Sequence, residues 1–134
     1  ISANRLDYWK NCLKDSCNYR SRQKMIIRSK KITQAAKDRS CVCCGIEDGT
    51  IVRAHYSGMR QHQYGKGRSI KGADAAAADL CFKCHSKFDA YEMGKGDTRE
   101  LRQIDQSEQF LHYCMMTLLR DIEAGIYRIG EKNG

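Results

Sequence analysis

The sequence of 134 residues contains no proline, no long apolar run and no visible secretory signal. Because a membrane-spanning helix needs roughly 18 consecutive apolar residues, the lack of such a run argues against a membrane protein. The lack of proline leaves helices uninterrupted. Apolar residues make up 41% of the chain and charged residues 30%, an ordinary soluble composition that leans towards helix. We therefore expect one compact soluble domain, since this length supports a single modest core.

Basic residues outnumber acidic residues only in the N-terminal part of the chain. The net charge is +8, and residues 1–40 hold 11 lysines and arginines against 3 acids, whereas residues 41–134 hold 13 of each. The whole excess therefore lies in an N-terminal arm, which we place at residues 1–38 and expect to be helical. Such an arm suits a polyanion, most often nucleic acid, although a solvated helix face accounts for the charge equally well. Lys30 and Lys31 belong to its most basic stretch.

Cysteine, in contrast, is plentiful at eight residues. Cys41 and Cys44 form one C-x2-C pair, Cys81 and Cys84 form a second, and 36 residues separate the two pairs. This pattern predicts a tetrahedral structural zinc site with four thiolate ligands, ahead of disulfides and with iron as the less common metal. Cys43 is a bystander or an alternative ligand. The cysteines without an evident partner are expected to be small buried residues: Cys12, Cys17 and Cys114.

The distribution of apolar residues and glycines predicts the remaining elements. In order, these are a strand at 51–56, a long ordered loop at 57–74, a short helix at 81–92 and a last helix at 97–124. In the last helix, apolar residues at three- and four-residue steps predict the core face: Leu101, Ile104, Leu111, Met115, Leu118 and Ile122. The chain thus reads as an α+β protein with a zinc-clipped core over residues 39–96. Residues 97–134 are expected to pack on this core as a C-terminal helix.

Two polar side chains follow the second cysteine pair on the predicted short helix. His85 and Asp89 are four residues apart, which places both on one face. An imidazole and a carboxylate there can chelate a divalent cation distinct from the zinc, although an ordinary surface pair is the simpler interpretation. His55 ends the predicted strand, and a zinc clip that folds strand, loop and helix together can bring it opposite His85. The sequence therefore predicts a small metal and base site.

Residues 39–89 resemble the HNH (ββα-metal) endonucleases of the phage and prophage type. The stretches that carry the resemblance are 41-CVCC-44, 54-AH-55, 65-GKGRSIKGAD-74 and 81-CFKCHSKFD-89, with the helix that leads into the first cysteine pair. The resemblance covers about 60 of the 134 residues, and the C-x2-C-H ending is its most specific part. It implies a small ββα-metal core clipped by the four-cysteine zinc site, with flanking N- and C-terminal helices.

The resemblance also implies an activity. Its members are metal-dependent endonucleases that hydrolyse phosphodiester bonds, so the expected partner is DNA and the expected location is the cytoplasm of a bacterial host that carries the phage or prophage. A role in recombination fits the same family. By resemblance, His55 acts as general base on a water, and the catalytic ion, Mg2+, Mn2+ or a similar cation, is bound by His85 and Asp89.

Two positions depart from the family pattern. Many such sites carry an aspartate or histidine immediately before the base, where this chain has Ala54, and the central asparagine falls near Ala76. Asp74 is the nearest polar candidate and can orient His55 or reach the metal. Alternatively, His55 itself binds the metal and a different group activates the water.

Acidic residues are absent from positions 53–73, where five cations occur: Arg53, Arg60, Lys66, Arg68 and Lys71. With Lys30 and Lys31 they are candidate contacts to nucleic-acid phosphates, and the glycines of this stretch let the backbone approach closely. Nothing resembles a base-reading element, so we expect low sequence specificity. The alternative function is a non-catalytic zinc-containing nucleic-acid-binding or recombination accessory protein, which the two departures from the family pattern favour.

Overall fold

The computed structural model describes residues 27–67 and 70–128 and has an α+β fold built on a two-stranded antiparallel sheet. The elements in chain order are α2 (Lys30–Gln34), β1 (Val52–His55), the short 3-10 helix η1 (Gln61–Tyr64), β2 (Ala77–Leu80), α3 (Phe82–Asp89) and α4 (Arg99–Glu123). The predicted α+β class is therefore confirmed. Most of the predicted basic arm, with Cys12 and Cys17, and also Arg68 lie outside the described residues.

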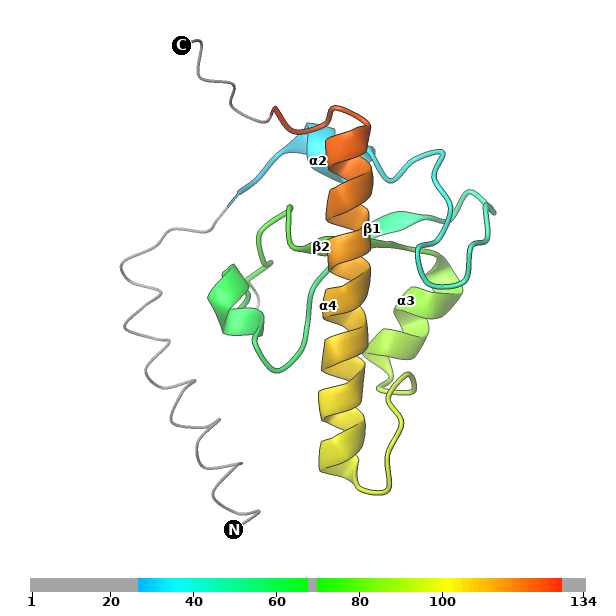
Figure 1. Ribbon diagram of the computed structural model, residues 1–134, viewed down its shortest axis with the longest axis vertical. Helices are drawn as coiled ribbons and strands as arrows, with labels where there is room; N and C mark the ends of the chain where they lie inside the picture. The colour runs from blue at the N-terminus through cyan, green and yellow to red at the C-terminus, as the bar shows by residue number, and fades with distance from the viewer. Residues whose placement is uncertain (1–26, 68–69, 129–134) are drawn as a thin grey trace.

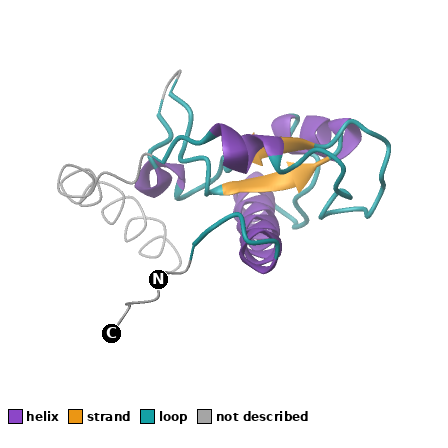
Figure 2. Cartoon of the chain, turned by 90° about the horizontal axis from the view of Figure 1, so that it is seen from above, coloured by secondary structure: helices purple, strands orange, loops and turns teal. Residues whose placement is uncertain are grey.

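The two strands form a hairpin connected by the long segment of residues 56–76. β1 and β2 pair antiparallel, with Val52 opposite Leu80 and His55 opposite Ala77. α4 lies on one side of this sheet, and α2 and α3 lie on the other (Figure 1, Figure 2). His55 therefore stands where β1 runs into the long connection, whereas α3 starts at the opposite end of the hairpin, directly after β2.

The sequence analysis did not predict β2, because alanine is a weak strand former. Ala77 and Ala78 are fully buried at 0% exposure. The next residue, Asp79, donates its backbone N–H to the hydroxyl of Thr117 on α4 at 3.0 Å. Small side chains let the long helix approach the strand closely, so a tertiary contact decides the conformation of this segment.

Local chemistry sets the ends of the two longer helices. Cys81 caps α3, because its sulfur accepts the backbone N–H of Cys84 at 3.4 Å. Thr98 caps α4 through its hydroxyl. Gly125, at a φ of +74°, follows the last turn of α4, and the predicted stop at this glycine is confirmed. The second cysteine pair thus also fixes where α3 begins.

Aromatic rings join α3, α4 and the end of β1 into one core. The ring of Phe110 lies 4.7 Å from that of Phe88 and 5.5 Å from that of Tyr56, edge to face in the second case. The three residues are at most 2% exposed. The Tyr56 hydroxyl shares a hydrogen bond of 2.6 Å with Ser107, which satisfies its buried oxygen.

The predicted core face of α4 is wrong in half of its residues. Leu101, Ile104 and Met115 are 50%, 44% and 55% exposed, whereas Leu111 packs against the core and Leu118 and Ile122 are partly buried. Apart from one aromatic ring, the buried residues of α4 are small or polar: Gln106, Ser107, Phe110, Cys114, Thr117 and Asp121. Their polar side chains find hydrogen-bond partners inside the molecule, which offsets the cost of burial. The predicted burial of Cys114 is confirmed at 6% exposure. Within the described part of the chain, no helix combines the length and apolar character needed to cross a membrane.

Candidate functional site

Four cysteines converge where the first cysteine pair meets the hairpin. The sulfur atoms of Cys41, Cys44, Cys81 and Cys84 all lie within 4.8 Å of one another, and those of Cys44 and Cys81 are 3.7 Å apart. Zn–S bonds of about 2.3 Å in a tetrahedron place sulfurs about 3.8 Å apart, whereas a disulfide requires about 2.05 Å. All four thiols are free. The predicted cluster is therefore confirmed, and it can hold a structural metal such as zinc.

The surroundings of the thiols shift their pKa values in different directions. Burial acts to raise the pKa of Cys41, but backbone hydrogen bonds within the cluster lower this pKa to about 7. Burial raises the pKa of Cys84, and the neighbouring thiols raise it further. Because four adjacent thiolates repel one another, a cation that binds them must displace protons. Cys43 lies outside the four, beside Tyr113, and its thiol raises the pKa of Tyr113 to about 12.

A buried network of arginines and aspartates ties together the segments that lead into the two cysteine pairs. Arg53 of β1 lies 2.8 Å from Asp79 of β2 and forks onto Asp121 of α4 at 2.6 and 3.1 Å. Arg39, which precedes the first cysteine pair, reaches Asp121 at 2.5 Å and Asp79 at 3.2 Å. Asp79 and Asp121 thus hold the segments that precede the two cysteine pairs against α4.

Arg53 is therefore not available to nucleic acid, and its assignment as a phosphate contact is corrected. Its side chain is 1% exposed and faces two carboxylates rather than solvent. From the sequence alone, an arginine next to a loop rich in cations is expected to lie at the surface. Here its partner Asp121 lies 68 positions away along the chain, so no local pattern reveals the pairing.

A second candidate centre lies where the long connection leaves and rejoins the hairpin. His55 Nε2 and Asp74 Oδ1 are 2.7 Å apart, and the two side chains are 15% and 7% exposed. The backbone N–H of Ser29 donates to the other carboxylate oxygen at 2.7 Å. The guanidinium of Arg28 lies 3.7 Å from Asp74 Oδ1. The carboxylate is thus fixed from two sides and in turn holds one edge of the imidazole.

These contacts keep Asp74 ionised. Burial acts to raise its pKa, but the hydrogen bonds from His55 and Ser29 and the charge of Arg28 outweigh burial and lower the pKa below its usual value. Because an ionised carboxylate only accepts hydrogen bonds, it selects the imidazole tautomer with its proton on Nε2. The Nδ1 atom of His55 then carries the lone pair that a general base needs.

His85 and Asp89 lie one turn apart on α3. His85 Nε2 is 3.7 Å from Asp89 Oδ2, and the side chains are 38% and 70% exposed, so a cation can reach both from solvent. In residues 27–67 and 70–128, only the four cysteines form a group of three or more ligating side chains that could hold a metal ion. His55 with Asp74 and His85 with Asp89 therefore do not together form such a group.

The other described candidates for phosphate contacts reach solvent at least in part: Lys30, Lys31, Arg60, Lys66 and Lys71. Arg28 joins two of the segments that carry them, because its guanidinium donates to the backbone carbonyls of Lys71 and Gly72. α2 begins two residues after Arg28, so its lysines follow directly on the segment that contacts Asp74.

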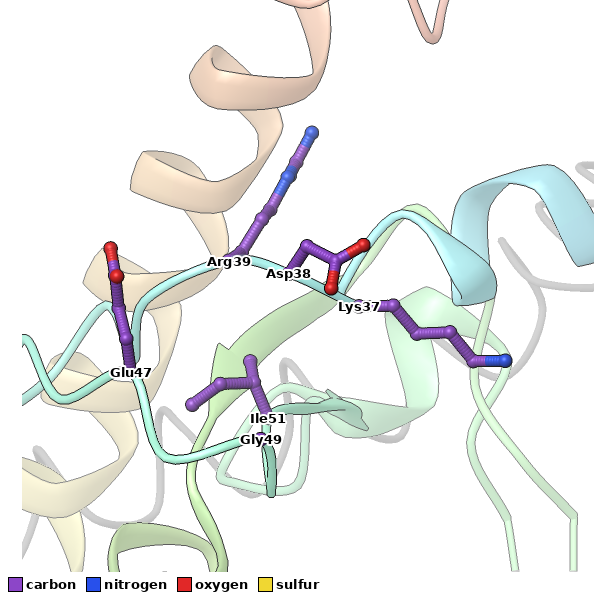
Figure 3. Close-up of a pocket in the computed structure, with 6 residues that line it drawn as sticks. All are labelled: Lys37, Asp38, Arg39, Glu47, Gly49 and Ile51. Carbon is purple, nitrogen blue, oxygen red and sulfur yellow. The ribbon is translucent and has the colours of Figure 1, made fainter.

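A cavity of about 550 Å³ lies elsewhere, between the end of α2 and the turn before β1 (Figure 3). Its lining residues are Lys37, Asp38, Arg39, Glu47, Gly49 and Ile51. The two cations and two acids of this lining cancel in charge, and Figure 3 shows the side chain of Arg39 extending towards α4, where it pairs with Asp121. No candidate catalytic side chain lines this cavity, so it does not serve the centre at His55.

The roles of Arg28 and Ser29 were not predicted from the sequence, where both residues fell within the basic helical arm. A serine ahead of a helical segment is an N-cap signal, and the Ser29 hydroxyl does accept the backbone N–H of Ile32 at 3.4 Å. That signal places the start of α2 and leaves the backbone N–H of Ser29 outside the helix.

Comparisons with models of protein families, with curated proteins and with solved structures find no match to the chain.

Proposed function

We propose that the protein is a metal-dependent endonuclease of the HNH type, which hydrolyses phosphodiester bonds of DNA with low sequence specificity. The hydrogen bond of 2.7 Å between His55 and Asp74 carries the proposal. It joins the two ends of a long connection in a hairpin that is followed by a helix, and the cysteine cluster lies at the start of that helix. A histidine oriented by an ionised carboxylate has the arrangement of a general base.

In the proposed reaction, Nδ1 of His55 takes a proton from a water molecule, and Asp74 stabilises the imidazolium that results. The water oxygen forms a bond to phosphorus while the bond from phosphorus to the 3′ oxygen breaks. The leaving 3′ oxygen takes a proton from solvent, and the imidazolium of His55 returns its proton to solvent. A divalent cation held by His85 and Asp89 would neutralise charge on the phosphoryl and leaving oxygens. Asp74 takes the orienting role, since the chain has alanine near position 76.

Positive charge supports DNA as the substrate. The chain carries a net charge of +8, and Lys30, Lys31 and Lys71 are exposed near the segment that contacts Asp74. Lysines that neutralise phosphates release counterions, so binding should weaken steeply as the salt concentration rises. The absence of a base-reading element supports low specificity.

Nicking of supercoiled plasmid by the full chain in Mg2+, Mn2+ and other divalent ions tests the proposal. We expect His55→Ala to slow cleavage by at least about 100-fold, because a positioned general base contributes that much. Asp74→Asn should slow cleavage by about 10- to 100-fold through loss of orientation of the imidazole. Zinc content and DNA binding should stay unchanged in both variants.

The matched control is His62→Ala, which removes an exposed histidine of η1 and should leave the cleavage rate as it is. Cleavage by His55→Ala at the rate of the unaltered chain would show that His55 is not the base.

A second candidate function is that of a zinc-containing nucleic-acid-binding or recombination accessory protein without catalysis. The observation that favours it is that, among the described residues, the two pairs form no common metal-binding group, and His85 and Asp89 alone give a cation only two protein ligands. Binding of duplex DNA without nicking in any divalent ion would support this second function over the first.

A further inference from the structure

The outward face of α4 carries exposed apolar side chains near both ends of the helix, with polar side chains between them. Leu101, Ile104, Met115, Met116 and Leu119 are 50%, 44%, 55%, 37% and 54% exposed. At 3.6 residues per turn these five residues, here called the outward stripe, project opposite the buried residues of the same helix. The stripe extends over roughly 27 Å at 1.5 Å per residue. Among the described helices, α4 alone lies on its side of the sheet (Figure 2), so the other helices do not cover the stripe.

Two exposed polar residues, Glu108 and His112, stand at the centre of the outward stripe, one turn apart. The stripe is nearly symmetric about the point between them. If a second α4 lies antiparallel across it, the position numbers of facing residues add to about 220. Leu101 then faces the partner's Leu119, Ile104 faces the partner's Met116, and Met115 faces the partner's Asp105, which is half-buried in the single chain. Glu108 faces the partner's His112, whose imidazole N–H can donate to the carboxylate.

We propose that two copies of this chain associate through the outward stripe, with their α4 helices antiparallel about a two-fold axis near position 110. The ends of the helix agree with this arrangement, because Arg99 comes near the partner's Glu123 and both are exposed. A parallel pair would set Glu108 against Glu108 and His112 against His112, which repel when charged. The complementary charges of Glu108 and His112 thus favour a second copy of this chain on the stripe and favour the antiparallel direction of its α4. The proposal does not depend on nuclease activity.

The expected association is reversible. A single helical stripe buries less surface than the roughly 1,200 Å² typical of stable interfaces, so dissociation should fall in the micromolar range. Such a dimer is isologous, because the same residues act on both sides.

Sedimentation velocity of the full chain over a range of micromolar concentrations tests the proposal. We expect a concentration-dependent monomer–dimer equilibrium. Glu108→Arg should raise the dissociation constant by at least about tenfold, because it replaces the acceptor that faces His112. The double variant Glu108→Arg/His112→Glu should restore association in the antiparallel arrangement, whereas in a parallel pair it would place like charges together twice.

Glu92→Arg makes the same change of charge at an exposed position outside α4 and should leave the dissociation constant unchanged. Thermal unfolding of each variant checks that the fold persists. A chain that stays monomeric at every concentration overturns the proposal, whether or not another segment covers the stripe. A dimer that the double variant fails to restore overturns the antiparallel arrangement.

Discussion

The two faces of α4 depart from the distribution of side chains that is usual in a helix of a globular protein, because polar side chains are buried on one face and several large apolar side chains are exposed on the other. The inward face buries Thr117 and Asp121 at 0% and 1% exposure, whereas Leu101, Met115 and Leu119 on the outward face are each at least 50% exposed. The inward polar groups are paired with Asp79, Arg53 and Arg39. Satisfied polar contacts, and not apolar spacing alone, therefore decide which face of α4 is buried.

The largest expected effect comes from removing the inward carboxylate. Asp121→Ala takes the forked partner from Arg53 and a partner from Arg39, which leaves buried positive charge uncompensated. We expect the free energy of unfolding to fall by about 3–5 kcal/mol, measured by chemical denaturation. Glu123→Ala, an exposed acid two residues further along α4, should cost less than about 0.5 kcal/mol. Equal effects of the two substitutions would show that the network does not hold α4 in place.

A smaller effect is expected at Thr117. Thr117→Val keeps the shape of the side chain but removes the oxygen that accepts the backbone N–H of Asp79 at 3.0 Å. Because that buried donor loses its partner, unfolding should become easier by about 1–3 kcal/mol. Thr117→Ser keeps the hydroxyl and should be milder in the same denaturation experiment. If valine is tolerated as well as serine, the hydrogen bond is not what binds α4 to β2.

The smallest effect is expected on the outward face. Met115→Ser, tested at concentrations at which the chain is monomeric, should change the free energy of unfolding by less than about 0.5 kcal/mol. The same replacement one residue earlier, Cys114→Ser, puts a hydroxyl into the core and should cost more, about 1–3 kcal/mol. Burial also raises the pKa of Cys114 to about 12, as expected for a thiol away from water. A large loss for Met115→Ser alone would mean that the outward face is covered within one chain.

Some features of the fold were readable from the sequence because they are local. The C-x2-C spacing brings two thiols together within each pair, so the four-cysteine cluster follows once the pairs meet. The stop of α4 at Gly125 and the short helix after the second cysteine pair are also local features. Asp74 was singled out as the polar candidate nearest to the missing asparagine position near Ala76, and the structure places it in contact with His55 at 2.7 Å.

Other features depended on contacts between distant segments. β2 is alanine-rich, and only the approach of α4 makes it a strand. The inward orientation of Arg53 requires Asp79 and Asp121, which lie on two other elements. Apolar spacing on α4 indicated an amphipathic helix correctly but gave no means of deciding which face met the core.

The pairing of Arg53 with Asp79 has a consequence for register. The two residues are direct partners across the hairpin. Of their neighbours in the sheet, the alanines are small, and only Leu80 is a large buried side chain whose burial would also resist a shift of one residue. A slipped strand would in addition leave buried charges without partners. The correct pairing sets His55 opposite Ala77, and so decides how far the chain runs from that point back to Asp74. Charges remote from any reaction thereby set the separation of the two groups proposed to perform it.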